Sequence, residues 1–291
     1  MDRVRKALDL ARLERMHTDA SVRPERGVPP AGEPEEASAA GVAPAGVAPA
    51  GAALGKSLVE IAYSRTRVFA PALEHLERNR IVNPASAGPA AAAYRMLRTQ
   101  VLQRMDANNW RILAMFSAGA EDGKTTTAIN LAVSLGGDHS HTVLLVDLDF
   151  KRPQLAPYFG LTPEFGVDDV LLGRAALEDC LYHPEGFERL VLLPAKAGLS
   201  NSSHMLSGPR SRELMAELRA RYPERVIIVD LPPVLSAEDA LAFAPQVECG
   251  LVVAAEGRTR RTDLARTIEL LQKTPLVGTV LNRAADAPSG Y

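Results

Sequence analysis

The sequence predicts an α/β fold, with a doubly wound, mostly parallel sheet flanked by helices. Strongly apolar runs alternate with helical patterns between residues 111 and 283. This alternation is typical of parallel strands that are buried on both faces and joined by helices. Two apolar runs, VLLVD and VIIVD, end in an aspartate, and a third ends in a glycine-rich turn. Ligands bind at the carboxyl ends of the strands in such folds, so these positions are the candidates for chemistry.

The composition limits the class of protein. With 291 residues, 46% hydrophobic and 23% charged, the chain is long enough for one large α/β domain with an appendage. A formal net charge of -2 gives no global electrostatic reason to expect nucleic acid as a partner. The two cysteines, Cys180 and Cys249, lack metal-ligand spacing and favour a reducing compartment. No apolar stretch approaches about 18 residues, so we expect a cytoplasmic protein whose membrane contact is peripheral or through a partner.

Four segments are expected along the chain. Residues 1–20 contain a short, highly charged helix, and residues 21–56 are a disordered linker rich in Ala, Pro and Gly, with the tandem repeat GVAPA. Ordered sequence resumes at residues 57–285, which we interpret as the folded domain, and residues 286–291 form a short tail. The hydrophobic periodicity of the domain predicts helices at 90–105, after residue 124, at 211–222 and at 262–274. It predicts apolar strands at 111–116, 143–146, 190–195, 249–257 and 275–283, and a further strand within the segment 225–235.

The glycine-rich turn SAGAEDGKTTTAIN, Ser117 to Asn130, lies between a predicted strand and a predicted helix, as a phosphate-binding P-loop does. In a P-loop the glycines allow the backbone to approach phosphates, Lys124 reaches the β- and γ-phosphates, and Thr125 places its hydroxyl on Mg²⁺. A first glycine is replaced by alanine here, which matters only if that residue needs a positive φ. The expected nucleotide contacts are Ala118, Gly119, Ala120, Glu121, Asp122, Gly123, Lys124, Thr125 and Thr126.

A near-copy of this motif, AGAALGKS at 50–57, has a different context. The prolines and glycines before it preclude a central strand, so we interpret it as part of the linker. The strand and the helix around Lys124 therefore identify the working loop.

Three aspartates follow apolar strands. Asp147 and Asp149 are separated by one residue, so strand alternation predicts that both side chains point to the same side. Asp230 ends the VIIVD strand before two prolines, as a Walker B acid that holds Mg²⁺ through water does. A carboxylate at a strand end is often only a cap, but three beside a P-loop indicate a site. The expected catalytic residues are Lys124, Asp147, Asp149 and Asp230, and the expected metal ligands are Thr125, Asp149 and Asp230.

The motifs SAGAEDGKTTTAINLA, VLLVDLDFKRP and VIIVDLPPVLSAEDALA resemble those of the bacterial tyrosine kinases of capsule and exopolysaccharide systems, a P-loop family that includes Wzc-like cytoplasmic domains and free-standing CpsD- or CapB-like proteins. The resemblance covers roughly residues 81–282. It implies ATP and Mg²⁺ as cofactors, a membrane polysaccharide co-polymerase as partner and possible homo-oligomers, and it tolerates Ala118. In the wider Par/Min-like ATPases the position of Asn282 contacts adenine, although an asparagine that ends a strand is equally often a turn residue.

Two features depart from the family pattern. Family members commonly carry E-x-x-R-x-x-R on an assembly helix, and here Ala92 replaces the glutamate before Arg95 and Arg98, the candidate oligomer contacts. Members also end in a tyrosine cluster, whereas Tyr291 stands alone here, either as the candidate phosphoacceptor or as an incidental terminal residue.

These observations lead to a function hypothesis and two alternatives. The leading hypothesis is a Mg-ATP-dependent protein tyrosine autokinase that regulates capsule or exopolysaccharide biosynthesis and export, with Asp147 as the carboxylate that removes the phenol proton. The first alternative is a ParA/MinD-like ATPase switch, although the loop lacks the extra lysine of that class. The second is a nucleotide-sensing regulator of a polysaccharide co-polymerase without catalysis.

Overall fold

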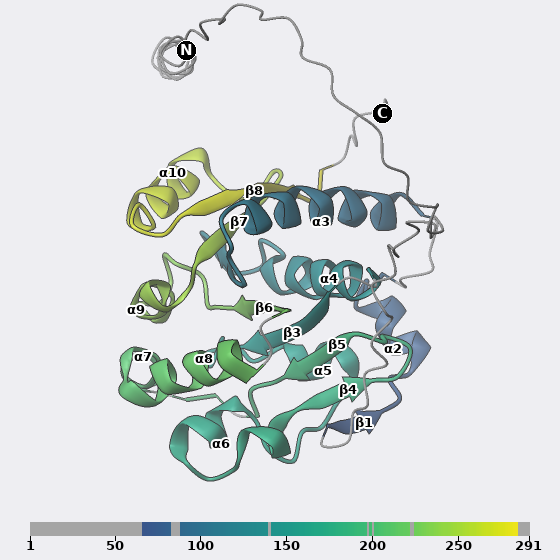
Figure 1. Ribbon diagram of the computed structural model, residues 1–291. Coiled ribbons are helices and arrows are strands. Elements are labelled where there is room, and N and C mark those ends of the chain that lie inside the picture. Colours follow the sequence, from purple (N-terminus) through teal and green to yellow (C-terminus); the bar gives the residue numbers. More distant parts are fainter. Residues whose placement is uncertain are drawn as a thin grey trace, which may run out of the picture. The chain divides into compact units, whose positions relative to one another are not determined.

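The computed structural model describes residues 66–82, 88–138, 141–196, 198–199, 201–221 and 224–284, which belong to one unit of the chain, Lys56–Tyr291. They form an eight-stranded sheet in the order β1-β4-β5-β3-β6-β2-β7-β8, with helices on both faces (Figure 1). The predicted doubly wound, mostly parallel α/β fold is confirmed. The helix predicted within residues 1–20, the linker at 21–56 and the tail at 286–291 lie outside the described residues.

The centre of the sheet brings together strands that are far apart in the sequence. β2 pairs in parallel with β6 on one side and β7 on the other, and β3 pairs with the far side of β6. Asp147 and Asp230 are register partners at the ends of β3 and β6, so the pairing itself brings two of the predicted acids together. These central strands are β2 (Ile112–Ser117), β3 (Thr142–Asp147), β6 (Arg225–Asp230) and β7 (Cys249–Ala255).

The outer strands are less regular. β8 (Leu276–Asn282) extends the sheet beyond β7, and β5 (Leu190–Leu193) extends it beyond β3. β4 (Tyr182–Pro184) runs antiparallel to β5 because a short turn joins them, whereas a parallel pair needs a crossover of a dozen or more residues. β1 (Arg67–Phe69) pairs in parallel with β4. Three-residue strands such as β1 and β4 carry too little periodicity to be predicted, and neither was.

The two faces of the sheet pack against different helices, because alternate residues of each strand point to opposite faces. Leu113 and Met115 of β2 belong to one core cluster, and Ala114 and Phe116 belong to the other. The first cluster is covered by α2 (Leu73–Arg78), α3 (Pro89–Ala107), α4 (Lys124–Gly136) and α5 (Leu155–Phe159). The second is covered by α6 (Val167–Leu172), α7 (Ser202–Ser207), α8 (Pro209–Arg221), α9 (Asp239–Phe243) and α10 (Arg261–Leu270). Short 3₁₀ turns occupy Leu177–Cys180 and Ala244–Gln246.

The long elements lie close to their predicted positions, and the differences have local causes. The strand within the apolar segment 225–235 ends at Asp230, as predicted, because Pro232 and Pro233 have no N–H to donate to a neighbouring strand. The strand predicted at 249–257 ends at Ala255, since the chain turns before the left-handed Gly257. The helix predicted at 262–274 ends at Leu270, five residues before a proline.

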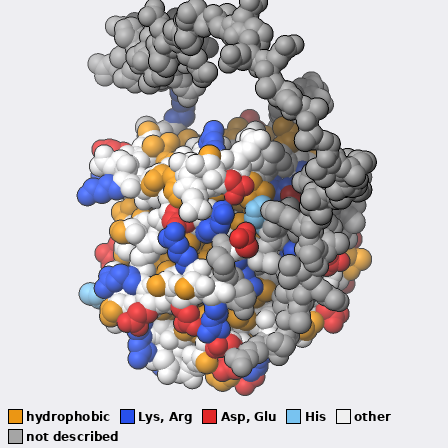
Figure 2. Space-filling view, viewed as in Figure 1, with side chains coloured by type: hydrophobic (Ala, Val, Ile, Leu, Met, Phe, Trp, Pro, Cys, Tyr) orange, Lys and Arg blue, Asp and Glu red, His pale blue; other side chains and the backbone are white. Residues whose placement is uncertain are grey.

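Charged side chains are mixed on the surface that Figure 2 shows. Lys and Arg lie beside Asp and Glu over the described part of this face. The visible face therefore carries no extended field of one sign among the residues that the structure describes.

The packing of β7 on β2 gives a test of the central sheet. A Cβ added at Gly250 would lie 2.5 Å from the ring of the fully buried Phe116. We expect Gly250→Ala to lower the free energy of unfolding by roughly 1–3 kcal/mol through overpacking. Gly136→Ala, whose Cβ would lie at an ordinary 3.5 Å from the backbone of Arg189, is the matched control and should not destabilise the protein. Urea denaturation of both variants decides, and equal losses would contradict the packing.

Candidate active site

The P-loop is the turn between β2 and α4. Gly123 has a left-handed backbone (φ 87°) directly before α4 begins at Lys124, and Glu121 is also left-handed (φ 63°). Ala118 is not among the described residues with positive φ, and its side chain is buried. An alanine at this position is therefore compatible with the loop, because the left-handed residues lie three and five positions after it.

Lys124 and Asp230 form a buried ion pair behind the loop. The Nζ of Lys124 donates to Oδ1 of Asp230, and the hydroxyl of Thr125 donates to the other carboxylate oxygen at 2.6 Å. The side chains of Lys124 and Asp230 are 5% and 3% exposed, so both charges are almost fully removed from water. The three residues form one unit because the P-loop strand β2 and the strand of Asp230, β6, are neighbours.

Asp147 is enclosed by the loop that follows it. Its Oδ1 accepts the N–H of Asp149, and its Oδ2 accepts the N–H groups of Gln154 and Leu155, each at 3.0 Å. Asp147 is fully buried and caps the first turn of α5. Burial and the charge of Asp230 raise the pKa of Asp147 to about 7, while the N–H donors and Lys124 oppose the rise.

Asp149 has different surroundings from Asp147. It lines the cavity above the P-loop, and its Oδ1 accepts the N–H of Arg152 at 3.0 Å. Burial raises the pKa of Asp149 above that of an ordinary aspartate, while Lys124 acts in the opposite direction. Strand alternation does not apply to this pair, since β3 ends at Asp147 and the chain then folds back toward α5.

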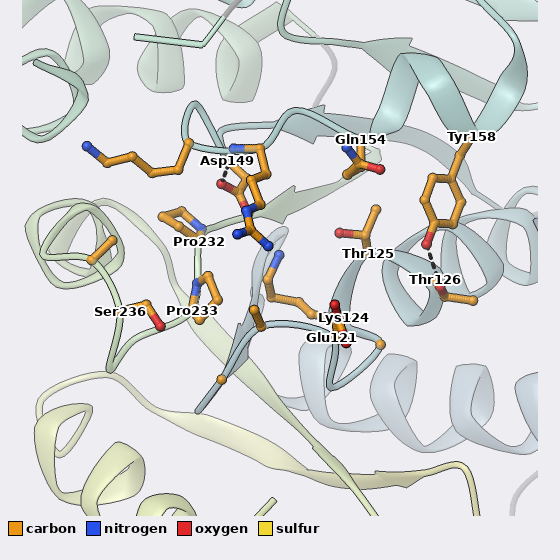
Figure 3. Close-up of a pocket in the computed structure, with 16 residues that line it drawn as sticks. Glu121, Lys124, Thr125, Thr126, Asp149, Gln154, Tyr158, Pro232, Pro233 and Ser236 are labelled. Atoms are coloured by element: carbon orange, nitrogen blue, oxygen red, sulfur yellow. Dashed lines mark hydrogen bonds between the residues drawn. The ribbon is translucent and has the colours of Figure 1, made fainter. Parts of the chain in front are cut away.

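The cavity itself has a volume of about 450 Å³. Lys124 and Thr125 reach into it from the P-loop, Asp149 faces them, and Pro232 and Pro233 border one side (Figure 3). Its lining consists of Gly119, Ala120, Glu121, Gly123, Lys124, Thr125 and Thr126 from the P-loop region, Asp149, Lys151, Arg152, Gln154 and Tyr158 after β3, and Pro232, Pro233, Ser236 and Ala237 after β6.

Several of these residues were not predicted. Tyr158 lies on α5, and its hydroxyl is 3.1 Å from the hydroxyl of Thr126 (Figure 3). Gln154 and Ser236 follow the strands β3 and β6 and line the same cavity. Their positions in the sequence could have indicated them, because all three residues follow closely after a strand that ends in a predicted aspartate.

Asn282 and Asp122, both predicted as nucleotide contacts, do not line this cavity. The Nδ2 of Asn282 donates to the backbone oxygen of Asp122 at 3.0 Å, behind the loop. Arg283 donates to the backbone oxygen of Glu121, also at 3.0 Å. The end of β8 therefore supports the P-loop from outside the cavity.

The predicted oligomer residues lie on α3. Arg98 already has a partner within the chain, since its guanidinium donates a hydrogen bond to the backbone oxygen of Ser134 on α4 at 3.0 Å. Arg95 is exposed on the same helix. The candidate phosphoacceptor Tyr291 lies outside the described residues.

The described ranges hold neither a ready-made metal site nor a membrane-spanning helix. No group of three or more His, Cys, Asp and Glu side chains there is arranged to hold a metal ion by itself. Mg²⁺ in nucleotide sites commonly uses one or two protein ligands together with phosphate and water, so the arrangement of Thr125 and Asp230 remains suitable for it. No helix in the described part of the chain is long and apolar enough to cross a membrane.

Comparison with known proteins identifies the family. The family model described as an AAA domain matches residues 111–277. The tyrosine-protein kinase YwqD of Bacillus subtilis is 28% identical over 209 residues, which are 71% of this chain and 86% of YwqD. The succinoglycan biosynthesis transport protein ExoP of Rhizobium meliloti is 30% identical over 217 residues, 70% of this chain, but this chain spans only 26% of ExoP.

A solved structure agrees with these relatives. The kinase domain of VpsO is 33% identical to the chain with a TM-score of 0.60, and the similarity covers 66% of this chain and 94% of that domain. The AAA domain model matches more than half of the chain, and several relatives of the chain, YwqD among them, are named tyrosine-protein kinases. The chain therefore belongs to the AAA domain family and, within it, to the bacterial tyrosine kinases.

Proposed function

We propose that this protein is a Mg-ATP-dependent tyrosine autokinase that acts in capsule or exopolysaccharide biosynthesis and export. One observation carries the proposal: Lys124 and Thr125 of a P-loop face Asp149 across a cavity of about 450 Å³. A cationic group, a hydroxyl and a carboxylate in this arrangement are what phosphoryl transfer from a nucleotide to a phenol requires.

The residues of the loop fit Mg-ATP. The first N–H groups of α4 have no partners within the helix, and the helix dipole favours negative charge at this end. Lys124 can neutralise phosphate charge, and the hydroxyl of Thr125 together with Asp230 can hold Mg²⁺. Bound Mg-ATP would supply the phosphoryl group that is transferred.

We assign proton removal to Asp149 rather than to Asp147. Both oxygens of Asp147 already accept backbone N–H groups, and the side chain has no exposed surface. Asp149 borders the cavity, and its raised pKa makes it a stronger base than an ordinary aspartate. In this assignment Asp147 orients the loop that carries Asp149, and Asp149 contacts the acceptor.

Tyr291 is the proposed phosphoacceptor. Among the described tyrosines, Tyr182 is buried, and its hydroxyl is bonded to the backbone of Phe165 and Glu164. Arg283 contacts the P-loop, and the eight residues from there to Tyr291 span at most roughly 26–29 Å when extended. This reach allows transfer within one chain as well as between neighbours, where Arg95 would contribute to the interface.

The proposed partner is a membrane polysaccharide co-polymerase. ExoP is named as a transport protein, and the matched region is about a quarter of its length. We propose that residues 57–285 form the catalytic domain and that residues 1–20, 21–56 and 286–291 are appended segments. Addition of the partner's cytoplasmic segment should raise tyrosine phosphorylation of the purified chain, and no increase would remove the partner from the proposal.

The lysine of the P-loop provides the first test. We expect Lys124→Met to reduce phosphotyrosine formation with Mg-ATP about 100-fold or more, because the transition state loses its main neutralising cation. Mass spectrometry of every tyrosine should locate the product on Tyr291, and Tyr291→Phe should remove that signal.

The control is Lys273→Met, an exposed lysine after α10, which should leave the rate unchanged. An undiminished phosphotyrosine signal in the Lys124→Met variant would contradict the assignment of the nucleotide site. Phosphate release without any phosphotyrosine would select an ATPase switch instead of a kinase.

The two aspartates give the second test. Asp147→Asn turns an amide toward at least one of three backbone N–H donors, so we expect a loss of roughly 1–3 kcal/mol in the free energy of unfolding. Asp149→Asn should change stability less and reduce the transfer rate about 10²–10⁴-fold. Urea denaturation and initial rates of phosphorylation measure the two effects, and the reverse pattern would return the role of base to Asp147.

The dependence of the rate on pH is the third test. A general base works when ionised, so the rate should be full above the pKa of Asp149 and fall as the pH drops through it. Burial raises this pKa, so the fall should lie above the range of an ordinary aspartate, about 3.9. The decrease of the rate at low pH should persist in the Asp147→Asn variant. It should be absent from the residual rate of the Asp149→Asn variant. If this decrease were absent only from the Asp147→Asn variant, the assignment of Asp149 as the general base would be contradicted.

A further inference from the structure

The P-loop contains a buried carboxylate that the proposed chemistry does not use. Asp122 lies directly before Gly123, yet it is 3% exposed and does not line the cavity. Its Oδ2 accepts the N–H of Gly119 at 2.9 Å, which closes the loop on itself. The carboxylate is therefore held behind the loop, away from the space that Lys124 and Thr125 border.

The other oxygen of Asp122 is held by Thr259, a residue 137 positions away in the sequence. The hydroxyl of Thr259 donates to Oδ1 of Asp122 at 2.8 Å and accepts the N–H of Ala255, at the end of β7, at 2.8 Å. The turn between β7 and α10 thus anchors the acid of the P-loop. Arg258 of the same turn forms an ion pair at 2.7 Å with Glu121, the residue before Asp122.

A carboxylate in this position opposes the binding of an anion. Like charges at short distance repel, and the repulsion is stronger where water is excluded. Asp122 is separated from the cavity only by the loop that bears it, since its neighbours Glu121 and Gly123 both line the cavity. If Oδ1 loses its donor, the buried carboxylate has an unsatisfied oxygen, and turning toward the cavity would satisfy it at the expense of the bound nucleotide.

We propose that Thr259 is a positioning residue for nucleotide binding: its hydroxyl keeps the charge of Asp122 turned away from the phosphates. The inference rests on the proposed nucleotide site and adds to it a residue that does not touch the ligand. It makes the β7–α10 turn part of the binding site through the hydrogen bond of Thr259 to Asp122.

The test measures affinity for Mg-ADP by titration calorimetry on the full chain. We expect Thr259→Val to weaken binding about tenfold and Asp122→Asn to change it less than threefold, since the amide oxygen can still accept the N–H of Gly119. The double variant Asp122→Asn/Thr259→Val should bind like Asp122→Asn, because the repelling charge is gone. A variant that only destabilises the fold would not regain affinity from a second substitution.

Matched controls separate the hydroxyl from the side chain as a whole. Thr259→Ser keeps the hydroxyl and should bind like the wild type, and Thr262→Val removes a hydroxyl from an exposed position at the start of α10 and should have no effect. Circular dichroism checks that each variant is folded at the temperature of titration.

The possible results are distinguishable. Unchanged affinity in Thr259→Val, or a double variant as weak as Thr259→Val, overturns the positioning role while the proposed function stands. A wild-type chain that does not bind Mg-ADP overturns both.

Discussion

The buried pair of Lys124 and Asp230 is the contact on which the site depends. Each charge has been taken out of water, so removing either one leaves the other unpaired, which typically costs about 3–5 kcal/mol. The pair joins the P-loop to β6, and Thr125 shares the same carboxylate. In the proposed function, a bound nucleotide would draw Lys124 toward phosphate and leave the charge of Asp230 without its partner, and a divalent cation beside Thr125 would compensate that charge. Binding of the nucleotide and binding of the metal are therefore expected to be coupled.

The sequence was sufficient to predict the central sheet and the acids at its edge. Continuous apolar runs such as VIIVD indicate strands buried on both faces, and parallel strands end at a common edge. This reasoning brings Asp147 and Asp230 together, as their register pairing does. It could not distinguish Asp147 from Asp149, because their surroundings depend on how residues 148–154 return to α5. Hydrogen bonds to backbone seven and eight residues away leave no periodic trace in the sequence.

The back of the P-loop was beyond prediction for another reason. Its supports come from the ends of β7 and β8, and the bond between Asn282 and Asp122 spans 160 positions. Asn282 was expected beside adenine by resemblance, a role that stays a prediction, while its visible partner is the loop backbone. Such contacts depend on strand order, which the alternation of helices and strands does not determine.

The order of the strands also has a consequence for synthesis of the chain. β2 carries the P-loop, but both of its neighbours, β6 and β7, are made more than 100 residues later. A ribosome produces the loop, its lysine and its first helix well before Asp230 exists to pair with them. A nascent chain therefore exposes the flanks of β2 until most of the domain has emerged, and parallel sheets with such distant pairings fold slowly. The interval in which β2 lacks its neighbours therefore runs from the synthesis of the P-loop to the synthesis of β6 and β7.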